Sequence, residues 1–158
     1  MANEEVHKVI EMINDVRIGM FTTHGKDGLL SRPLTVMDVE EDGDMWFFSP
    51  ADSEIVREVK THGEVNVAFA GNKKWVSVSG RGTVVYEVEK KRELWNSMVE
   101  TFAPEGPDSL ATVLLHVESE SAEYWENPGG AATLVASWIK QKVTGKGAAP
   151  GDSNTVEL

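Results

Sequence analysis

The chain has 158 residues and carries 15 Lys and Arg against 26 Asp and Glu, a formal charge of −11 at pH 7. This length supports one hydrophobic core, and the acidic balance argues against binding to nucleic acid or to an anionic membrane. The absence of cysteine excludes disulfides, zinc thiolates and iron–sulfur clusters, and no apolar run approaches the roughly 18 residues of a spanning helix. We therefore expect one cytoplasmic domain.

The N-terminal segment has the periodicity of a helix, with apolar residues at Val6, Val9, Ile10, Ile13 and Val16. The period then changes to short apolar or alternating runs, separated by HGKDG and EEDGD. Asp-Gly pairs tolerate the positive φ angles of tight hairpin turns. We predict three antiparallel strands near residues 18–23, 28–38 and 44–49.

A short helix is predicted next, in SPADSEIVREVKTHG, with Ser49 as its N-cap and Pro50 in its first turn. Two further strands follow, EVNVAFAG and WVSVSGRGTVVYEV, and both alternate apolar and polar residues. The second strand contains Gly80 and Gly82, which predict a bend or bulge of the kind that a small barrel needs at its corners.

A helix is predicted in EKKRELWNSMVETF, whose apolar residues have helical spacing. A sixth strand is predicted in LATVLLHVE, and a last helix is predicted around Leu134 to Ile139. Residues 146–158 contain few large apolar side chains and are expected to be a frayed tail. Six hairpin-connected strands with helices at the edges predict a single α+β domain over residues 1–145, mainly β, built as a small antiparallel barrel. An open sheet with helices on one face is the alternative.

Motifs of the common catalytic and metal sites are absent. The four histidines lie on different predicted elements without ligand spacing, so no metal site is predicted. Neither a nucleophile elbow nor a phosphate-binding glycine loop is present, and no catalytic residue is predicted. The acidic residues between 38 and 44 read either as a solvated hairpin or as a catalytic carboxylate pair.

One pattern favours a ligand. Phe48 and Ser49 end a predicted strand and lead into a helix N-terminus, where backbone N–H groups suit a phosphate, and Ser49 and Ser53 add hydroxyl donors. Arg32 lies on the apolar alternation of its strand, which requires an anionic partner. The pattern suits a phosphorylated, planar aromatic ligand. The alternative is that the aromatics are core, Ser49 is a cap and Arg32 is exposed at an edge.

Seven segments in order, SRPLTVM, MWFFSPADS…VREV, EVNVAF, WVSVSGRGTVV, ELWN, F-x-PEGPD and EYWENP, resemble the FMN-binding split barrels. The most similar branch is the general-stress-protein group related to pyridoxamine-phosphate oxidase, and the resemblance runs from about Glu4 to Gly145. It implies a six-stranded antiparallel split β-barrel with flanking helices. It also implies a homodimer with FMN at the subunit interface.

The resemblance implies a set of cofactor-binding residues that run along the isoalloxazine ring, down the ribityl chain and to the phosphate. They are Arg32, Pro33, Leu34, Thr35, Val36, Phe48, Ser49, Ser53, Trp75, Trp125 and Trp138. The first five would line the ring and ribityl side, and the next three would lead to the phosphate. Trp75 would lie beside the flavin, and the partner subunit would bring the last two tryptophans near the ring.

The chain departs from the family pattern at the phosphate motif, where Glu54 and Ile55 stand at positions commonly occupied by Lys or Arg. Each lost charge-assisted bond weakens binding by about 1.5–3 kcal/mol, unless Arg57 or Lys74 compensates. The C-terminal segment also lacks the Arg- and Pro-containing sequence that holds the oxidase's vitamin substrate. Pyridoxamine-phosphate oxidase activity is therefore not expected.

The sequence hypothesis is an FMN-binding protein of the general-stress type, a flavin-dependent oxidoreductase of unknown substrate. Two alternatives remain open at this stage. One is a non-catalytic flavin binder, and the other is a dimeric interaction module that has lost FMN through the changes at Glu54 and Ile55.

Overall fold

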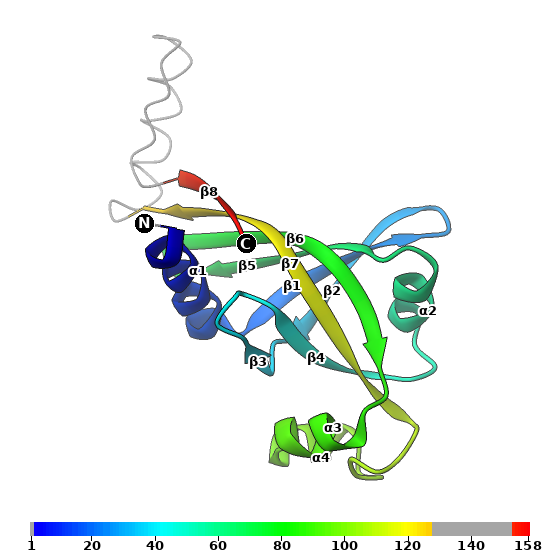
Figure 1. Cartoon of the computed structure of the whole chain (residues 1–158). Helices are drawn as coiled ribbons and strands as arrows, with labels where there is room; N and C mark the ends of the chain where they lie inside the picture. The colour runs from blue at the N-terminus through cyan, green and yellow to red at the C-terminus, as the bar shows by residue number, and fades with distance from the viewer. Residues whose placement is uncertain (1, 128–152) are drawn as a thin grey trace, which may run out of the picture.

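A computed structural model describes residues 2–127 and 153–158 and shows a curled sheet with helices at its edges (Figure 1). The helices are α1 (Ala2–Val16), α2 (Glu54–Thr61), α3 (Val88–Leu94) and α4 (Ser97–Phe102). The strands are β1 (Ile18–Gly25), β2 (Gly28–Thr35), β3 (Asp38–Val39), β4 (Met45–Pro50), β5 (Glu64–Gly71), β6 (Lys74–Val85), β7 (Thr112–Glu126) and β8 (Ser153–Glu157).

All described strand pairs are antiparallel, in the order β2-β1-β5-β6-β7-β4-β3, and β8 adds to β7. This arrangement confirms the mainly β, split-barrel prediction. Among the described strands, hydrogen bonds do not close the sheet, because β2 pairs there only with β1 and the path ends at β3. Strands β2 and β4 come close to each other without pairing, and this open seam is where the site described below lies.

The long strand β6 bends as its glycines predict. The register between β6 and β7 shifts between Ser79 and Gly80, which is the signature of a β-bulge. A Cβ atom on Gly80 would lie 2.1 Å from the carbonyl oxygen of Glu118, so no other residue fits this close approach. The bend lets β6 and β7 connect the strands β2, β1 and β5 on one side of the curled sheet with β4 and β3 on the other.

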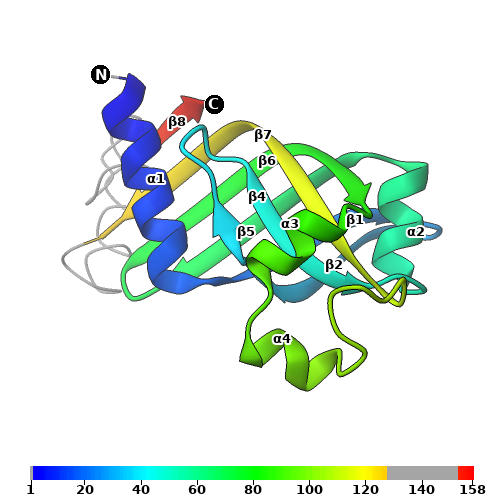
Figure 2. The same ribbon diagram turned by 60° about the horizontal axis from the view of Figure 1, so that its bottom comes forward.

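The core fills the interior of the sheet, and the two longer helices cover its two ends. Phe21 of β1 and Phe47 of β4 meet edge to face, with ring centroids 5.2 Å apart. Helix α1 buries Val9, Met12 and Ile13 against this core, and α2 buries three apolar residues at the other end (Figures 1 and 2). Both ends of the barrel are thus plugged by helices.

The helix predicted from Glu89 to Phe102 is split into α3 and α4. Trp95 and Asn96 are extended, and the Asn96 side chain accepts a hydrogen bond of 3.0 Å from the backbone N–H of Val99. Asparagine competes in this way for backbone donors and starts a new helix. The split places α4 below the open seam.

The C-terminal part also differs from the prediction. Strand β7 continues to Glu126 because β6 pairs with it from Leu114 to Glu126. Residues 153–157, expected within the frayed tail of 146–158, form β8 and pair with Ser121–Trp125 of β7, whose backbone groups would otherwise be unpaired. The rest of the predicted tail and the helix predicted around Leu134 lie outside the described residues.

Candidate functional site

An apolar cavity of about 350 Å³ lies at the open seam between β2 and β4, above α4. Its lining comes from these three elements, residues just after β2 and α4, and the start of β7: Pro33, Leu34, Thr35, Met37, Phe48, Ser49, Pro50, Met98, Val99, Phe102, Ala103 and Thr112. Five residues predicted to bind a cofactor therefore meet in one place, although they come from two strands that are not hydrogen-bonded to each other.

Local sequence explains why these strands leave a cavity here. Pro33 has no N–H to donate, and it lies in β2, which within residues 2–127 and 153–158 has a strand partner on one side only. Phe48 is half-buried and packs edge to face against Trp95, with ring centroids 5.3 Å apart. The aromatic ring is held at the edge of the cavity rather than in the core, so the seam stays open and apolar.

Ser49, which lines the cavity, forms a hydroxyl pair before α2 with Ser53, which does not line it. Their Oγ atoms are 2.9 Å apart, and Ser49 is almost completely buried. Ser53, not Ser49, is the N-cap of α2, because its Oγ accepts a bond from the backbone N–H of Val56 at 3.4 Å. Pro50 still belongs to β4, so the helix begins later than the sequence predicts.

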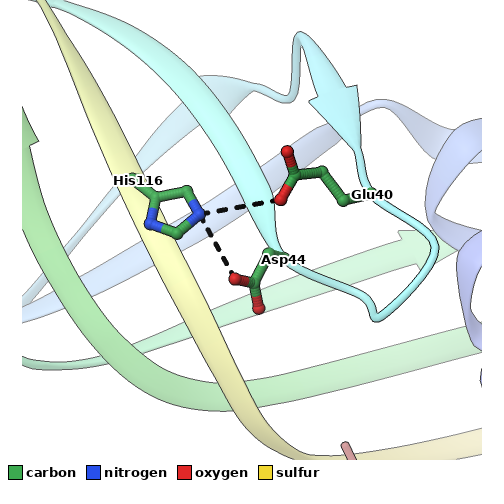
Figure 3. A group of neighbouring side chains, drawn as sticks. All are labelled: Glu40, Asp44 and His116. Carbon is green, nitrogen blue, oxygen red and sulfur yellow. Dashed lines mark ion pairs between the residues drawn. The ribbon is translucent and has the colours of Figure 1, made fainter.

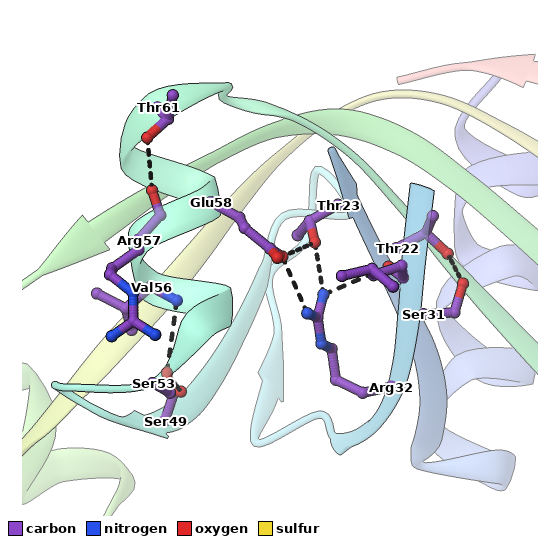
Figure 4. Close-up of polar contacts among 11 residues, drawn as sticks. Thr22, Thr23, Ser31, Arg32, Ser49, Ser53, Val56, Arg57, Glu58 and Thr61 are labelled. Atoms are coloured by element: carbon purple, nitrogen blue, oxygen red, sulfur yellow. Dashed lines mark hydrogen bonds and ion pairs between the residues drawn. The ribbon is translucent and has the colours of Figure 1, made fainter. Parts of the chain in front are cut away.

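Arg32 does not line the cavity. Figure 4 shows its guanidinium turned toward Thr23 of β1 and Glu58 of α2. Its Nη2 donates to the Glu58 Oε2 at 2.9 Å, and its Nη1 donates to the Thr23 hydroxyl, which in turn donates to the same carboxylate oxygen. The anionic partner that an inward arginine requires is thus supplied by the chain itself.

The Glu58 carboxylate stays ionised in this setting. Burial alone would raise its pKa, but the hydrogen bonds from Thr23 and Arg32 and the charges of Arg32 and Arg57 outweigh burial, and the pKa of Glu58 is lowered. The side chains of Arg32 and Glu58 are 23% and 14% exposed, so this ion pair is largely withdrawn from water.

The two cations considered as substitutes for the missing phosphate ligands have other partners. Arg57 is exposed and its Nη1 donates to the backbone oxygen of Asp52 at 2.7 Å. Lys74 forms an ion pair with Asp15 of α1. Neither residue lines the cavity.

Other predicted site residues lie elsewhere. The Val36 side chain is buried in the core. Trp75 and Trp125 are cross-strand partners beside a second apolar cavity of about 350 Å³, which Ile18 and Met20 also line. This cavity shares no lining residue with the first one. Trp138 lies outside the described residues.

Sequence reasoning missed the contribution of α4. The helical spacing of residues 89–102 places Met98 and Phe102 on the apolar face of one predicted helix, whereas in the structure both line the cavity. The side chain of Phe102 is 83% exposed, which is unusual for so large an apolar residue. The Asn96 cap signal could have located the start of α4, but not the direction in which it faces.

A separate charged cluster lies on the β3–β4 hairpin and β7. The Nε2 atom of His116 lies 3.3 Å from Asp44 and 4.0 Å from Glu40 (Figure 3). These three residues are of the types that bind divalent cations. Asp44 also accepts a bond of 2.9 Å from the backbone N–H of Ser119, and Lys90 lies 4.0 Å from Glu40. The cluster therefore connects to β7 the hairpin whose acidic residues the sequence left as either a solvated turn or a catalytic carboxylate pair.

None of the helices in the described part of the chain is long and apolar enough to cross a membrane.

Comparison with known proteins gives one matching family, described as pyridoxamine 5'-phosphate oxidase like, whose model matches residues 4–149. No curated protein gives a significant match.

Several solved structures are similar to the chain. A general stress FMN/FAD binding protein from Xanthomonas citri is 25% identical, with 81% of this chain and 92% of that chain covered and a TM-score of 0.71. A putative general stress family protein from Xanthomonas campestris pv. campestris is also 25% identical, with 83% and 92% covered and a TM-score of 0.71. A putative general stress protein 26 from Jannaschia sp. CCS1 shares the fold at 19% identity, with 98% and 99% covered and a TM-score of 0.73.

Proposed function

This chain belongs to the pyridoxamine 5'-phosphate oxidase-like family, and we propose that it binds a flavin in the cavity between β2 and β4. The observation that carries the proposal is the meeting of Pro33, Leu34, Thr35, Phe48 and Ser49 around one apolar cavity. A flat tricyclic ring suits such a cavity, because apolar walls bury its faces while backbone groups and a few hydroxyls fix its orientation. The 25% identical structure described as FMN/FAD binding supports the same ligand class.

The residues present fit the two parts of FMN differently. The apolar wall formed by β2, Phe48 and α4 would hold the ring. The Ser49 and Ser53 hydroxyls, 2.9 Å apart at the start of α2, would receive the ribityl and phosphate end. When bound, a flavin would supply hydride or electron transfer, while the protein would position the ring and exclude water.

An FMN-dependent oxidoreductase is the main candidate, and a non-catalytic flavin binder is the second. No Asp, Glu, His, Lys, Arg or Tyr is among the described residues that line the cavity. Proton transfer at the ring would therefore depend on water or substrate, an arrangement that also suits storage or sensing of the cofactor. Turnover of NAD(P)H with an acceptor would favour the enzyme, and flavin binding without turnover would favour the binder.

A cytoplasmic homodimer is part of the proposal. The exposed apolar side chains of Ile18, Met20 and Trp125 surround the second cavity and could meet a second copy of the chain. Such a copy could cover apolar surface that a monomer leaves in water. Light scattering should give the mass of two chains, whereas a monomer at all concentrations would remove this part of the proposal.

Flavin titration tests the proposal directly. Purified protein is expected to carry a ligand with flavin absorption, which mass spectrometry would identify as FMN, another flavin or a deazaflavin. Replacing Ser49 by alanine should weaken FMN binding about two- to tenfold, the value of one hydrogen bond. The matched control is Ser31→Ala, which removes an exposed hydroxyl of β2 that bonds Thr22. Protein that neither carries nor binds any flavin would refute the proposal.

A further inference from the structure

The arginine that precedes the cavity residues of β2 is already bound to an internal anion. Arg32 precedes Pro33, the first cavity residue of β2, and Glu58 lies on the helix that Ser53 caps. The Arg32 Nη2 to Glu58 Oε2 distance is 2.9 Å, and Thr23 bridges both partners with its hydroxyl (Figure 4). Thr23 is completely buried, so this triad is a fixed part of the structure.

The surrounding charges do not favour an additional anion. Glu54 follows the capping Ser53 directly and is exposed, and Glu58 lies one turn further along α2. The guanidinium of Arg57 is engaged with the backbone of Asp52. A dianionic phosphate at the Ser49–Ser53 pair would therefore meet hydroxyl donors, the carboxylate of Glu54 and the exposed guanidinium of Arg57, and Arg32 would contribute to its binding only by leaving Glu58.

We propose that Glu58 determines flavin specificity, by holding Arg32 so that the site binds a flavin with a neutral tail about as well as one with a phosphate. This inference rests on the proposed flavin function. The preferred class of ligand is the isoalloxazine ring with its ribityl chain, and the phosphate adds little to its affinity.

The phosphate would add little affinity because binding it through Arg32 would exchange one ion pair for another. If the phosphate took Arg32 from Glu58, one charge-assisted bond would replace another. The released carboxylate would keep the Thr23 hydroxyl and the charge of Arg57 but lose its only hydrogen-bonded counter-ion among the described residues, and separating a largely buried charge from its counter-ion is costly. Because the pKa of Glu58 is lowered, protonation does not relieve this cost at neutral pH.

The experiment compares the dissociation constants of riboflavin and FMN, measured by quenching of flavin fluorescence in the flavin-free protein. The wild type is expected to bind the two within about tenfold of each other, or about 1.4 kcal/mol. Replacing Glu58 by glutamine frees Arg32 and should tighten FMN binding at least about tenfold. Riboflavin binding should change little, since riboflavin carries no phosphate.

A charge-matched set of variants isolates the ion pair. Arg32→Gln should weaken FMN relative to riboflavin, because it leaves the Glu58 carboxylate without its counter-ion. The double variant Arg32→Gln/Glu58→Gln keeps the net charge of the wild type and should restore the wild-type ratio. Glu11→Gln removes an exposed carboxylate of α1, at the other end of the sheet, and should leave the ratio unchanged.

The possible failures are distinguishable. Binding of neither flavin would refute the flavin function itself. Binding of both, with FMN preferred by more than about a hundredfold in the wild type, would overturn the role of Glu58 and leave the flavin function intact. An unchanged ratio in Glu58→Gln would overturn it too. If Glu58→Gln does not fold, the double variant Arg32→Gln/Glu58→Gln tests the proposal instead. A ratio of its riboflavin and FMN dissociation constants that differs from the wild-type ratio would contradict the proposal.

Discussion

The cavity at α4 and the Thr23–Arg32–Glu58 triad both include residues of β2, yet they differ in whether their polar and charged groups have partners within the protein. In the triad every charged group has an internal partner, and the side chains are largely withdrawn from water. In the cavity, apolar side chains such as Phe102 remain in water. The contrast teaches that the apolar cavity is open to a ligand, whereas the guanidinium of Arg32 is already bound by a carboxylate of the protein.

The largest effect is expected when the triad is broken. Arg32→Ala leaves the largely buried Glu58 carboxylate without its cation and should lower the free energy of unfolding by about 2 kcal/mol. Urea denaturation at pH 7 measures this loss. Arg81→Ala, which removes an exposed arginine of β6, is the control and should cost less than about 0.5 kcal/mol. Equal losses for the two variants would place Arg32 among ordinary surface residues.

Filling the cavity should affect binding and spare the fold. Ala103 lines the cavity at the end of α4, and Ala103→Phe would place a ring where the flavin is proposed to lie. Flavin affinity should fall at least about tenfold, or 1.4 kcal/mol, with unfolding free energy changed by less than that. Fluorescence titration and denaturation of the same preparation provide the two values. Undiminished flavin affinity would separate the cavity from the flavin site.

Acid should weaken the triad before it affects the cavity. The pKa of Glu58 is lower in the folded state than its ordinary value of 4.5, so its contribution to stability is complete above that value. The contribution decreases as the pH falls toward the folded-state pKa, because the unfolded chain takes up the proton first. Glu58→Gln should therefore be less stable than the wild type at pH 7, and the difference should narrow below pH 4.5. A constant difference would contradict the assignment.

The smallest stability effect is expected at Phe102. Since this side chain is 83% exposed, Phe102→Ser should change the unfolding free energy by less than about 0.5 kcal/mol. Flavin affinity should nevertheless fall a few-fold, because the ring covers part of the cavity. Thermal denaturation together with flavin titration checks both values. A marked loss of stability would mean that Phe102 packs within the protein in solution.

Sequence patterns predict most of the strands because alternation and Asp-Gly turns are local signals. The resemblance to the FMN-binding split barrels, rather than a local pattern, implies that Pro33, Leu34, Thr35, Phe48 and Ser49 belong to one site, and in the structure all five line one cavity. Flavin binding by these residues remains a prediction. The bend at Gly80 is a further success, since a glycine in a long strand signals close backbone approach.

Local sequence patterns do not show which residues far apart in the chain come into contact. The alternation of β2 indicates that Arg32 needs an anion, but only the folded chain shows that Glu58, 26 residues later, supplies it. The split between α3 and α4 depends on a single asparagine cap within a continuous apolar period. Residues 153–157 have no strong strand pattern and become ordered through the unpaired edge of β7.

One edge of strand β7 pairs with two strands, with β4 along residues 112–117 and with β8 along residues 121–125. Deleting residues 153–158 would therefore remove the strand that pairs with residues 121–125 of β7. The backbone N–H and C=O groups of these residues would then be free to bind other molecules. Edges of this kind recruit neighbouring chains. A truncated form should thus self-associate by strand addition, and a design that fuses a tag or reporter after Leu158 has to leave that short C-terminal strand intact.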